Sequence, residues 1–140
     1  MNLDALEQLW LATMRMGADV RKRTGIELSR AFDLLRSAKP LLNECRLDDE
    51  AEPELLIRAE KMTHAAHREI YIAGEALGEN FTEGWDNVFD GVMRGEKIGE
   101  FPISKPSFYP NMPRGNWVKL KPPKGLGVRK LMEIAKSQGL

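Results

Sequence analysis

The chain has few of the residues that carry covalent or metal chemistry. Among its 140 residues there is one cysteine, Cys45, and there are two histidines, His64 and His67. A single cysteine excludes a disulfide within the chain and is compatible with a reducing cytosol. Because Leu41 and Leu42 lie close before Cys45, we expect a buried structural thiol rather than a reactive one. Nucleophilic catalysis needs a base beside the nucleophile, so the shortage of histidine favours a protein without catalytic chemistry.

Long apolar runs are also missing. No apolar stretch approaches the roughly 18–20 residues that a membrane-spanning helix needs. Acidic residues interrupt the apolar positions of the first 25 residues, which excludes an uninterrupted signal-peptide core there. A chain that is 42% apolar and 30% charged has the composition of a globular domain in water. We therefore expect a single cytoplasmic domain with no membrane contact.

The formal net charge is zero because the two halves of the chain carry opposite net charges. Residues 1–96 contain 12 Lys and Arg against 19 Asp and Glu, whereas residues 97–140 contain 9 against 2. A basic extension on an acidic body is suited either to fold back onto that body or to bind another molecule.

Apolar residues recur at steps of three and four in four segments of the acidic half, and each segment predicts an amphipathic helix. The first predicted helix covers residues 3–24 and ends before Gly25, a favourable residue after a helix. The second covers residues 27–45. Pro40 lies inside it and is expected to kink or split the helix near Lys39.

The other two predicted helices follow an acidic loop at residues 48–52. Pro53 suits the first position of the third helix, which reaches about Leu77. Asn80 followed three residues later by Glu83 indicates a capping box at the start of a short fourth helix. Each amphipathic face has to be buried against another. The predicted fold class is therefore all-α, an antiparallel bundle of three to four helices.

The pattern changes in the basic half. Residues 101–123 contain six of the eight prolines, with aromatic residues between them, which predicts extended backbone. The chain is thus divided into an acidic helical bundle at residues 1–96, a proline- and aromatic-rich basic arm at 97–125, and an amphipathic helix at 126–140. A short strand at residues 116–121 fits the partial alternation of apolar residues within the arm.

The basic and aromatic residues of this half form the main candidate site. Lysine and arginine pair with phosphates and aromatic faces stack on bases, as in single-stranded nucleic-acid binding. Proline-rich segments also dock on proteins, and the same aromatics could instead pack the arm onto its own bundle. The candidate residues for binding a partner or a nucleic acid are Tyr109, Arg114, Trp117, Lys119, Lys121, Lys124, Arg129 and Lys130.

A second pattern involves both histidines. Glu60, His64 and His67 fall at i, i+4 and i+7 of the third predicted helix, a spacing that suits ligands of a divalent metal. The apolar stripe that contains Met62 and Ala66 lies on the opposite side, so we expect a solvated polar face here. No fourth ligand is visible, and no cofactor is expected.

Two short motifs stand out in the helical body. One is Leu-Leu-Arg-Ser-Ala-Lys at 34–39 with Leu-Leu-Asn at 41–43, and the other is Gly-Glu-Asn-Phe at 78–81 ahead of Trp85. A weaker match lies at residues 113–118. On these motifs the chain resembles an uncharacterised family of small helical cytosolic proteins from methanogenic and related archaea. The resemblance implies an archaeal cytosolic setting and supplies no activity. Pro40, which lies inside the first motif, departs from what that family's helix would carry.

The sequence thus predicts a non-catalytic interaction or assembly protein that docks on a larger macromolecular complex through its basic arm. An RNA- or DNA-binding protein that uses the same arm is the alternative. A small metal-dependent enzyme that uses Glu60, His64 and His67 comes third. The oligomeric state is left open.

Overall fold

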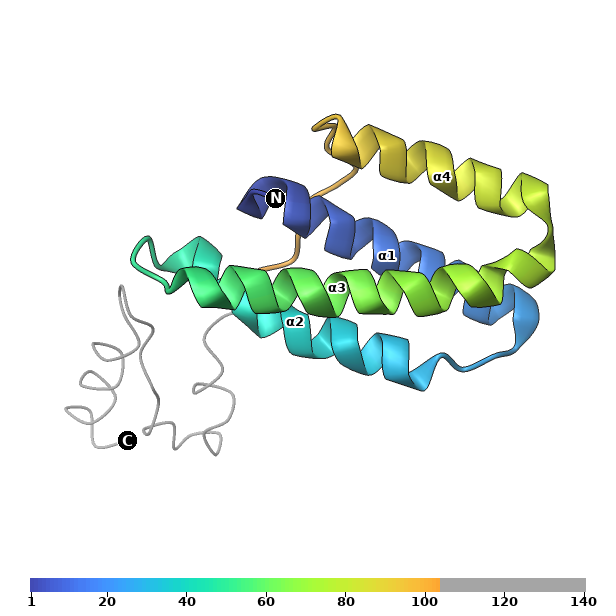
Figure 1. Cartoon of the computed structure of the whole chain (residues 1–140), viewed down its shortest axis with the longest axis horizontal. Helices are drawn as coiled ribbons and strands as arrows, with labels where there is room; N and C mark the ends of the chain where they lie inside the picture. Colours follow the sequence, from blue (N-terminus) through green and yellow to red (C-terminus); the bar gives the residue numbers. More distant parts are fainter. Residues whose placement is uncertain (104–140) are drawn as a thin grey trace.

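A computed structural model describes residues 1–103 of the chain (Figure 1). The rest of the predicted arm and the predicted terminal helix lie outside the described residues, and so does every candidate from Tyr109 to Lys130. Residues 1–103 are helical and contain no strand. The elements are α1 (Leu3–Thr24), α2 (Ser29–Leu47), α3 (Pro53–Gly74), the short 3-10 helix η1 (Glu75–Leu77) and α4 (Glu79–Met93). The predicted all-α class is confirmed for this part of the chain.

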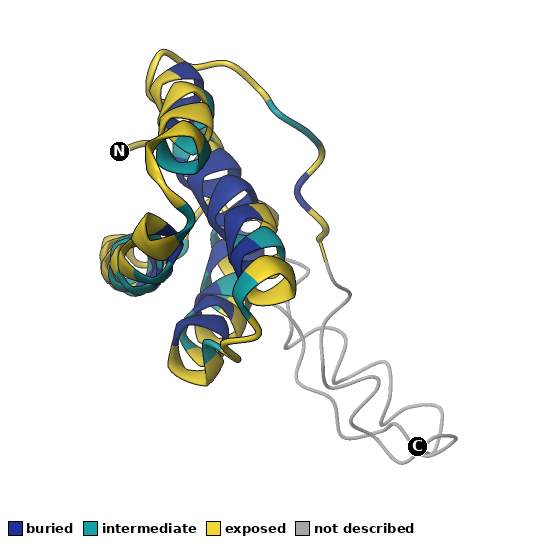
Figure 2. Cartoon of the chain, turned by 90° about the vertical axis from the view of Figure 1, so that its right-hand side faces the viewer, coloured by how far each residue is buried: buried dark blue, intermediate teal, exposed yellow. Residues whose placement is uncertain are grey.

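Successive helices run in opposite directions. α3 packs most extensively on α2 and also on α1, whereas α4 lies mainly along α1 (Figure 1). The chain then leaves α4 and passes behind α1, on the side away from α3, towards residue 103 (Figures 1 and 2). No helix in the described residues is long and apolar enough to cross a membrane.

The core lies between α1, α2 and α3. Buried residues occupy the sides of these helices that face one another (Figure 2). Burying each large aliphatic side chain contributes about 1.5–3 kcal/mol. The indole Nε1 of Trp10 donates a buried 2.8 Å hydrogen bond to the carbonyl of Leu35 and so joins α1 to α2. The largest fully buried apolar side chains are Leu6, Met16, Val20, Leu35, Leu42, Ile70 and Val92.

Small residues lie where the three core helices meet. A Cβ atom on Gly17 would stand 2.9 Å from Cδ1 of Ile70 and 3.0 Å from Cζ of Phe32. On α3, Ala59 and Ala66 are fully buried. A larger side chain at any of these points would push the helices apart.

The ends of α1 and the start of α3 agree with the sequence. The Asn2 side chain caps α1 by accepting a 2.7 Å hydrogen bond from the N–H of Ala5. Gly25 ends α1 with a φ of 79°, a left-handed conformation that glycine adopts without strain. Pro53 is the first residue of α3, as predicted.

The second helix differs from its prediction. α2 is one continuous helix, so of the two expected outcomes, a kink or a split near Lys39, the split does not occur. Pro40 leaves the carbonyl of Arg36 without a helical donor. Both residues are exposed, so water can supply that hydrogen bond. The helix also starts two residues later than predicted, after Leu28, which has a left-handed φ of 54°.

Two further expectations are corrected. The capping box at Asn80 does not form, because Gly78 with a φ of 100° turns the chain into α4 at Glu79 and places Asn80 inside the first turn. Cys45 is half-buried rather than fully buried. Its partial burial, with Glu44 nearby, raises the pKa of the thiol, which keeps the thiol protonated at neutral pH.

Candidate functional site

The segment after α4 is fastened to α1 by a buried glutamine. Nε2 of Gln8 donates a 2.8 Å hydrogen bond to the carbonyl of Gly99, and its Oε1 accepts bonds from the N–H groups of Ile98 (2.6 Å) and Gly99 (3.2 Å). Arg15 adds a 3.0 Å bond from Nη1 to the carbonyl of Ile98. Four hydrogen bonds therefore hold two consecutive residues of the segment on the surface of α1.

Phe101 completes this attachment. Its side chain is only 8% exposed, and its ring meets that of Trp10 edge to face at 5.2 Å between centroids. Edge-to-face pairs add about 0.5–1.5 kcal/mol beyond the area they bury. Residues 98–101 were assigned to the predicted arm, and the structure shows that they pack on the helical body.

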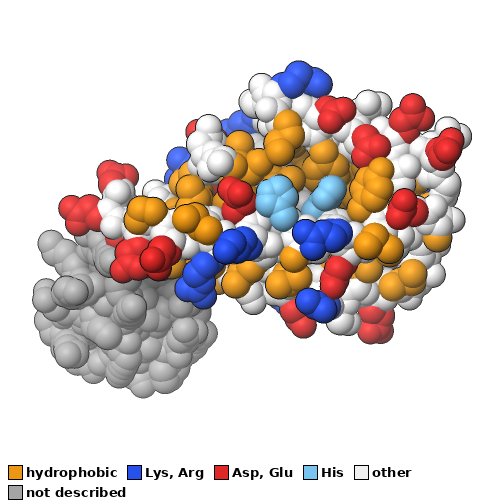
Figure 3. Space-filling view, viewed as in Figure 1, with side chains coloured by type: hydrophobic (Ala, Val, Ile, Leu, Met, Phe, Trp, Pro, Cys, Tyr) orange, Lys and Arg blue, Asp and Glu red, His pale blue; other side chains and the backbone are white. Residues whose placement is uncertain are grey.

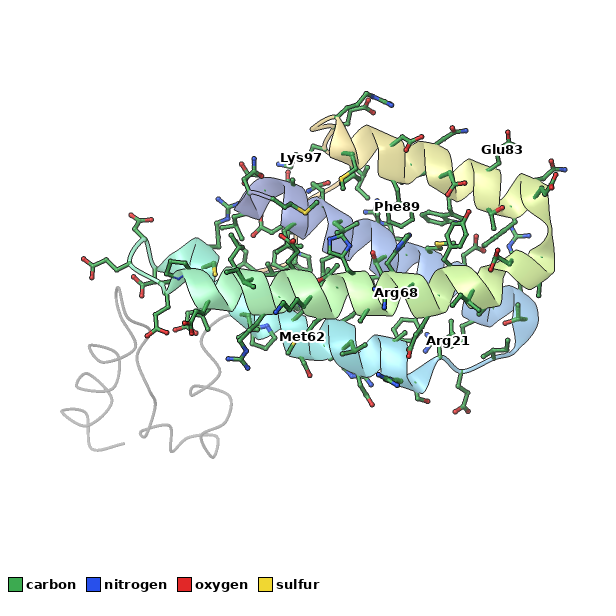
Figure 4. All side chains as sticks on the ribbon, in the orientation of Figure 1. Arg21, Met62, Arg68, Glu83, Phe89 and Lys97 are labelled. Carbon is green, nitrogen blue, oxygen red and sulfur yellow. The ribbon has the colours of Figure 1, made fainter. Side chains whose placement is uncertain are left out.

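The returning segment forms one wall of a groove at the start of α1, with a volume of about 480 Å³. The first turns of α1, Arg46 near the end of α2, Val92 near the end of α4 and the segment from Gly95 to Ile103 line it. We call this the amino-terminal groove. Lys97, which lines it, is labelled at this end of the molecule in Figure 4.

Acidic side chains outnumber basic ones around the amino-terminal groove. The carboxylates belong to Asp4, Glu7, Glu96 and Glu100, and the cations to Arg46 and Lys97. Such a lining attracts cationic groups and repels anionic ones. The apolar parts of its wall suit the methylene stems of lysine and arginine.

Within the groove, Arg46 is already neutralised. Its Nη2 lies 2.6 Å from Oε1 of Glu7 and its Nε lies 3.2 Å from Oε2, which is a two-point contact. The Glu7 side chain is only 7% exposed, and Asp4 also accepts a hydrogen bond from Nη2. The hydrogen bonds from Glu7 and Asp4 hold the pKa of Arg46 above its usual range. The pair of Arg46 and Glu7 is a structural element. Accessible negative charge in the groove therefore comes from Asp4, whose side chain is 83% exposed, and from the rim.

The rim carries Glu96 and Glu100. Their side chains are 59% and 88% exposed. Glu96 pairs with Arg94 at 2.8 Å and Glu100 with Lys97 at 3.1 Å, and both of these partners are also exposed. Exposed ion pairs contribute only about 0–1 kcal/mol, so another cation can replace either partner at little cost.

The two histidines lie on a different face, beside the contact between α3 and α4, and both are visible at the surface (pale blue in Figure 3). His67 meets the ring of Phe89 from α4 edge to face at 4.3 Å and lies 5.8 Å from the ring of Tyr71. Its Nε2 atom is buried, and no hydrogen-bond partner for it occurs within residues 1–103. We expected this face to be solvated unless another segment covered it. His67 is half-buried, because Phe89 of α4 packs against its ring, and the periodicity of α3 alone could not show that contact.

Burial lowers the pKa of His67, the neighbouring His64 lowers it further, and Asp86 acts in the opposite direction. Glu60 lies 3.6 Å from the amino terminus of the chain. In the described part of the chain, no three side chains of His, Cys, Asp or Glu gather closely enough to hold a metal ion. His67 acts here as a packing residue between α3 and α4.

Sequence reasoning missed the residues that build the amino-terminal groove. One signal was present, since the run Leu9–Ala12 is apolar on every side of α1. A helix turn of that kind is covered all round, which requires a further segment beyond the neighbouring helices. Nothing in the spacing pointed to Gln8 or to the pairing of Glu7 with Arg46.

Comparisons with protein-family models, with curated protein sequences and with solved structures found no match. The resemblance to the archaeal family stays a prediction from short motifs.

Proposed function

We propose that this chain is a non-catalytic interaction protein, an acidic helical body that presents its basic carboxyl-terminal residues to a larger protein complex. One observation carries the proposal: Gln8, Arg15 and Trp10 hold residues 98–101 on α1. The attachment fixes the point from which the basic residues leave the body. Fixing one end of a binding segment reduces the conformational entropy that is lost when a partner is bound.

The distribution of charge supports the same function. Residues 104–140 hold eight Lys and Arg against one Asp or Glu, whereas residues 1–103 hold 13 against 20. An acidic patch on a partner would attract the basic part and be repelled by the body, which orients the encounter. In this proposal the proline-rich arm is extended and the terminal helix docks with it.

Photo-cross-linking tests this proposal in the full chain. A photoreactive phenylalanine analogue placed at Trp117 should form a covalent adduct with a distinct protein when native cells are irradiated. The matched control places the same analogue at Ile72, an exposed position on α3. Adducts of equal pattern at both positions, or no adduct at Trp117, would contradict the proposal.

The composition of residues 104–140 also favours a second candidate function, binding of single-stranded nucleic acid. Eight cations with Tyr109 and Trp117 among them supply both phosphate pairing and base stacking. In that case the adduct at Trp117 would contain RNA or DNA. Affinity for single-stranded RNA would also fall steeply between about 50 and 200 mM salt, because each neutralised phosphate releases counterions.

A further inference from the structure

The amino-terminal groove has the size and charge to hold a basic segment. Its volume of about 480 Å³ lies within the range of ordinary ligand sites. Of its four carboxylates, Glu7 is buried in its pair with Arg46, and Asp4 also contacts Arg46 but is 83% exposed. The other two, Glu96 and Glu100, stand at the rim with exposed partners that can be exchanged.

The position of the chain indicates which basic segment can reach the groove. Ile103, the last described residue, itself lines the groove, so the remaining 37 residues start from its edge. Those residues carry a formal charge of +7 and the body carries −7. A tethered segment has an effective concentration in the millimolar range, which a free basic peptide rarely reaches.

We propose that a lysine- and arginine-bearing segment of residues 104–140 docks in the amino-terminal groove of its own chain, with its cations on Glu96 and Glu100. Docking masks basic residues that a partner would otherwise contact, so the groove acts as an internal competitor for partner binding. The docking is inferred from the groove and the charges and does not depend on the proposed function. Only its regulatory consequence rests on the proposed function.

Zero-length cross-linking of the full chain tests the docking. A carbodiimide joins a carboxylate to a lysine amine only where the two are in contact, and mass spectrometry then locates each amide. Amides are expected between Glu96 or Glu100 and lysines of residues 104–140. The Lys97–Glu100 pair, already 3.1 Å apart, shows that the reaction has worked.

The matched control uses two exposed acids at the other end of α4, Glu79 and Glu83. Figure 4 shows Glu83 and Lys97 at opposite ends of this part of the molecule. Equal yields from Glu79 and Glu83, or none from the groove acids, would overturn the docking.

Isotopically heavy and light chains are mixed before the reaction. Amides that join a heavy chain to a light one would assign the groove to a second copy and would also overturn it.

The regulatory consequence has its own test. In the full chain with Glu96→Gln and Glu100→Gln, the yield of partner adduct at Trp117 should rise about threefold to tenfold, the range expected from the loss of two exposed ion pairs. The Glu79→Gln, Glu83→Gln chain should give the original yield. An unchanged yield in the groove variant overturns the competition. Absence of any partner adduct in every variant counts against the proposed function, while amides at the groove would still support the docking.

Discussion

The ring of Phe101 meets the ring of Trp10 edge to face, with centroids 5.2 Å apart and planes inclined at 76°. On its other side Trp10 is hydrogen-bonded through its indole N–H to the carbonyl of Leu35. One tryptophan therefore links α1 to α2 and to the segment that follows α4. The start of the basic half is tied to the hydrophobic core.

Replacing Phe101 by alanine should lower the free energy of unfolding by about 2–4 kcal/mol, because the ring is buried and its removal uncovers Trp10. Urea unfolding of the full chain measures the change. Ile103→Ala is the control, since Ile103 is 49% exposed and should change stability by less than about 0.5 kcal/mol. Equal losses in the two variants would show that the segment is not packed at Phe101.

Arg46→Ala and Arg36→Ala compare two arginine ion pairs on the same helix. Arg46 holds a carboxylate that is 7% exposed, so its loss leaves Glu7 buried without its partner and should cost about 2–4 kcal/mol. Arg36 pairs with Asp33 where both side chains are well exposed, and its loss should cost less than about 0.5 kcal/mol. Thermal or urea unfolding distinguishes the two. A cost at Arg36 as large as that at Arg46 would refute the assignment of Glu7 to a buried pair.

Two glycine-to-alanine changes should have opposite signs. Gly84 lies inside α4 with nothing within 4 Å of an added Cβ, so Gly84→Ala should raise the free energy of unfolding by about 0.5–1 kcal/mol. Gly25 has a φ of 79°, where a side chain is strained, so Gly25→Ala should lower it by about 1 kcal/mol. Unfolding curves recorded side by side provide the measurement. A stabilised Gly25→Ala chain would mean that α1 does not end in the left-handed conformation.

Stability should fall when the pH is lowered through the range where histidine titrates. Burial holds the pKa of His67 below that of an unfolded chain, about 6.5, so the folded protein binds fewer protons near pH 6. The contribution of His67 is therefore complete above the unfolded pKa and is lost as the pH falls below it. His64, Asp86 and Tyr71 are the titratable groups around it.

Urea unfolding at about pH 7.5 and pH 5.5 should therefore show a larger loss for the natural chain than for His67→Leu. The leucine variant keeps an apolar contact with Phe89 and cannot be protonated. His64→Gln is the control, because it leaves the buried imidazole in place and should retain most of the pH dependence. If His67→Leu loses as much stability as the natural chain, the source of the pH dependence lies elsewhere.

Much of the helical body could be predicted from local signals. The period of apolar residues and the glycine after Thr24 gave α1 its bounds, and Pro53 gave the start of α3. The split at Pro40 and the capping box at Asn80 are both absent. Each rule describes the residue in isolation, whereas Pro40 lies on an exposed side of α2 and Gly78 has a positive φ.

The candidate site was less predictable, because it depends on contacts between residues far apart in the chain. Gln8 bonds to a residue 91 positions later, and Glu7 pairs with one 39 positions later. A periodic pattern reports which face of a helix is buried and not which distant segment covers it. The same limit explains why the contact of His67 with Phe89 of α4 was not foreseen.

The attachment of residues 98–101 to Gln8 and Trp10 also bears on how the protein folds during its synthesis. α1 leaves the ribosome before α2, α3 and α4, and domains assemble as the chain emerges. Yet the hydrogen-bond partners of Gln8 and the ring that covers Trp10 are made some ninety residues later. Contacts this distant in sequence form slowly, because a long loop has to close first. α1 thus keeps an apolar side uncovered until residues 98–101 have been synthesised, a natural window for a chaperone to bind it.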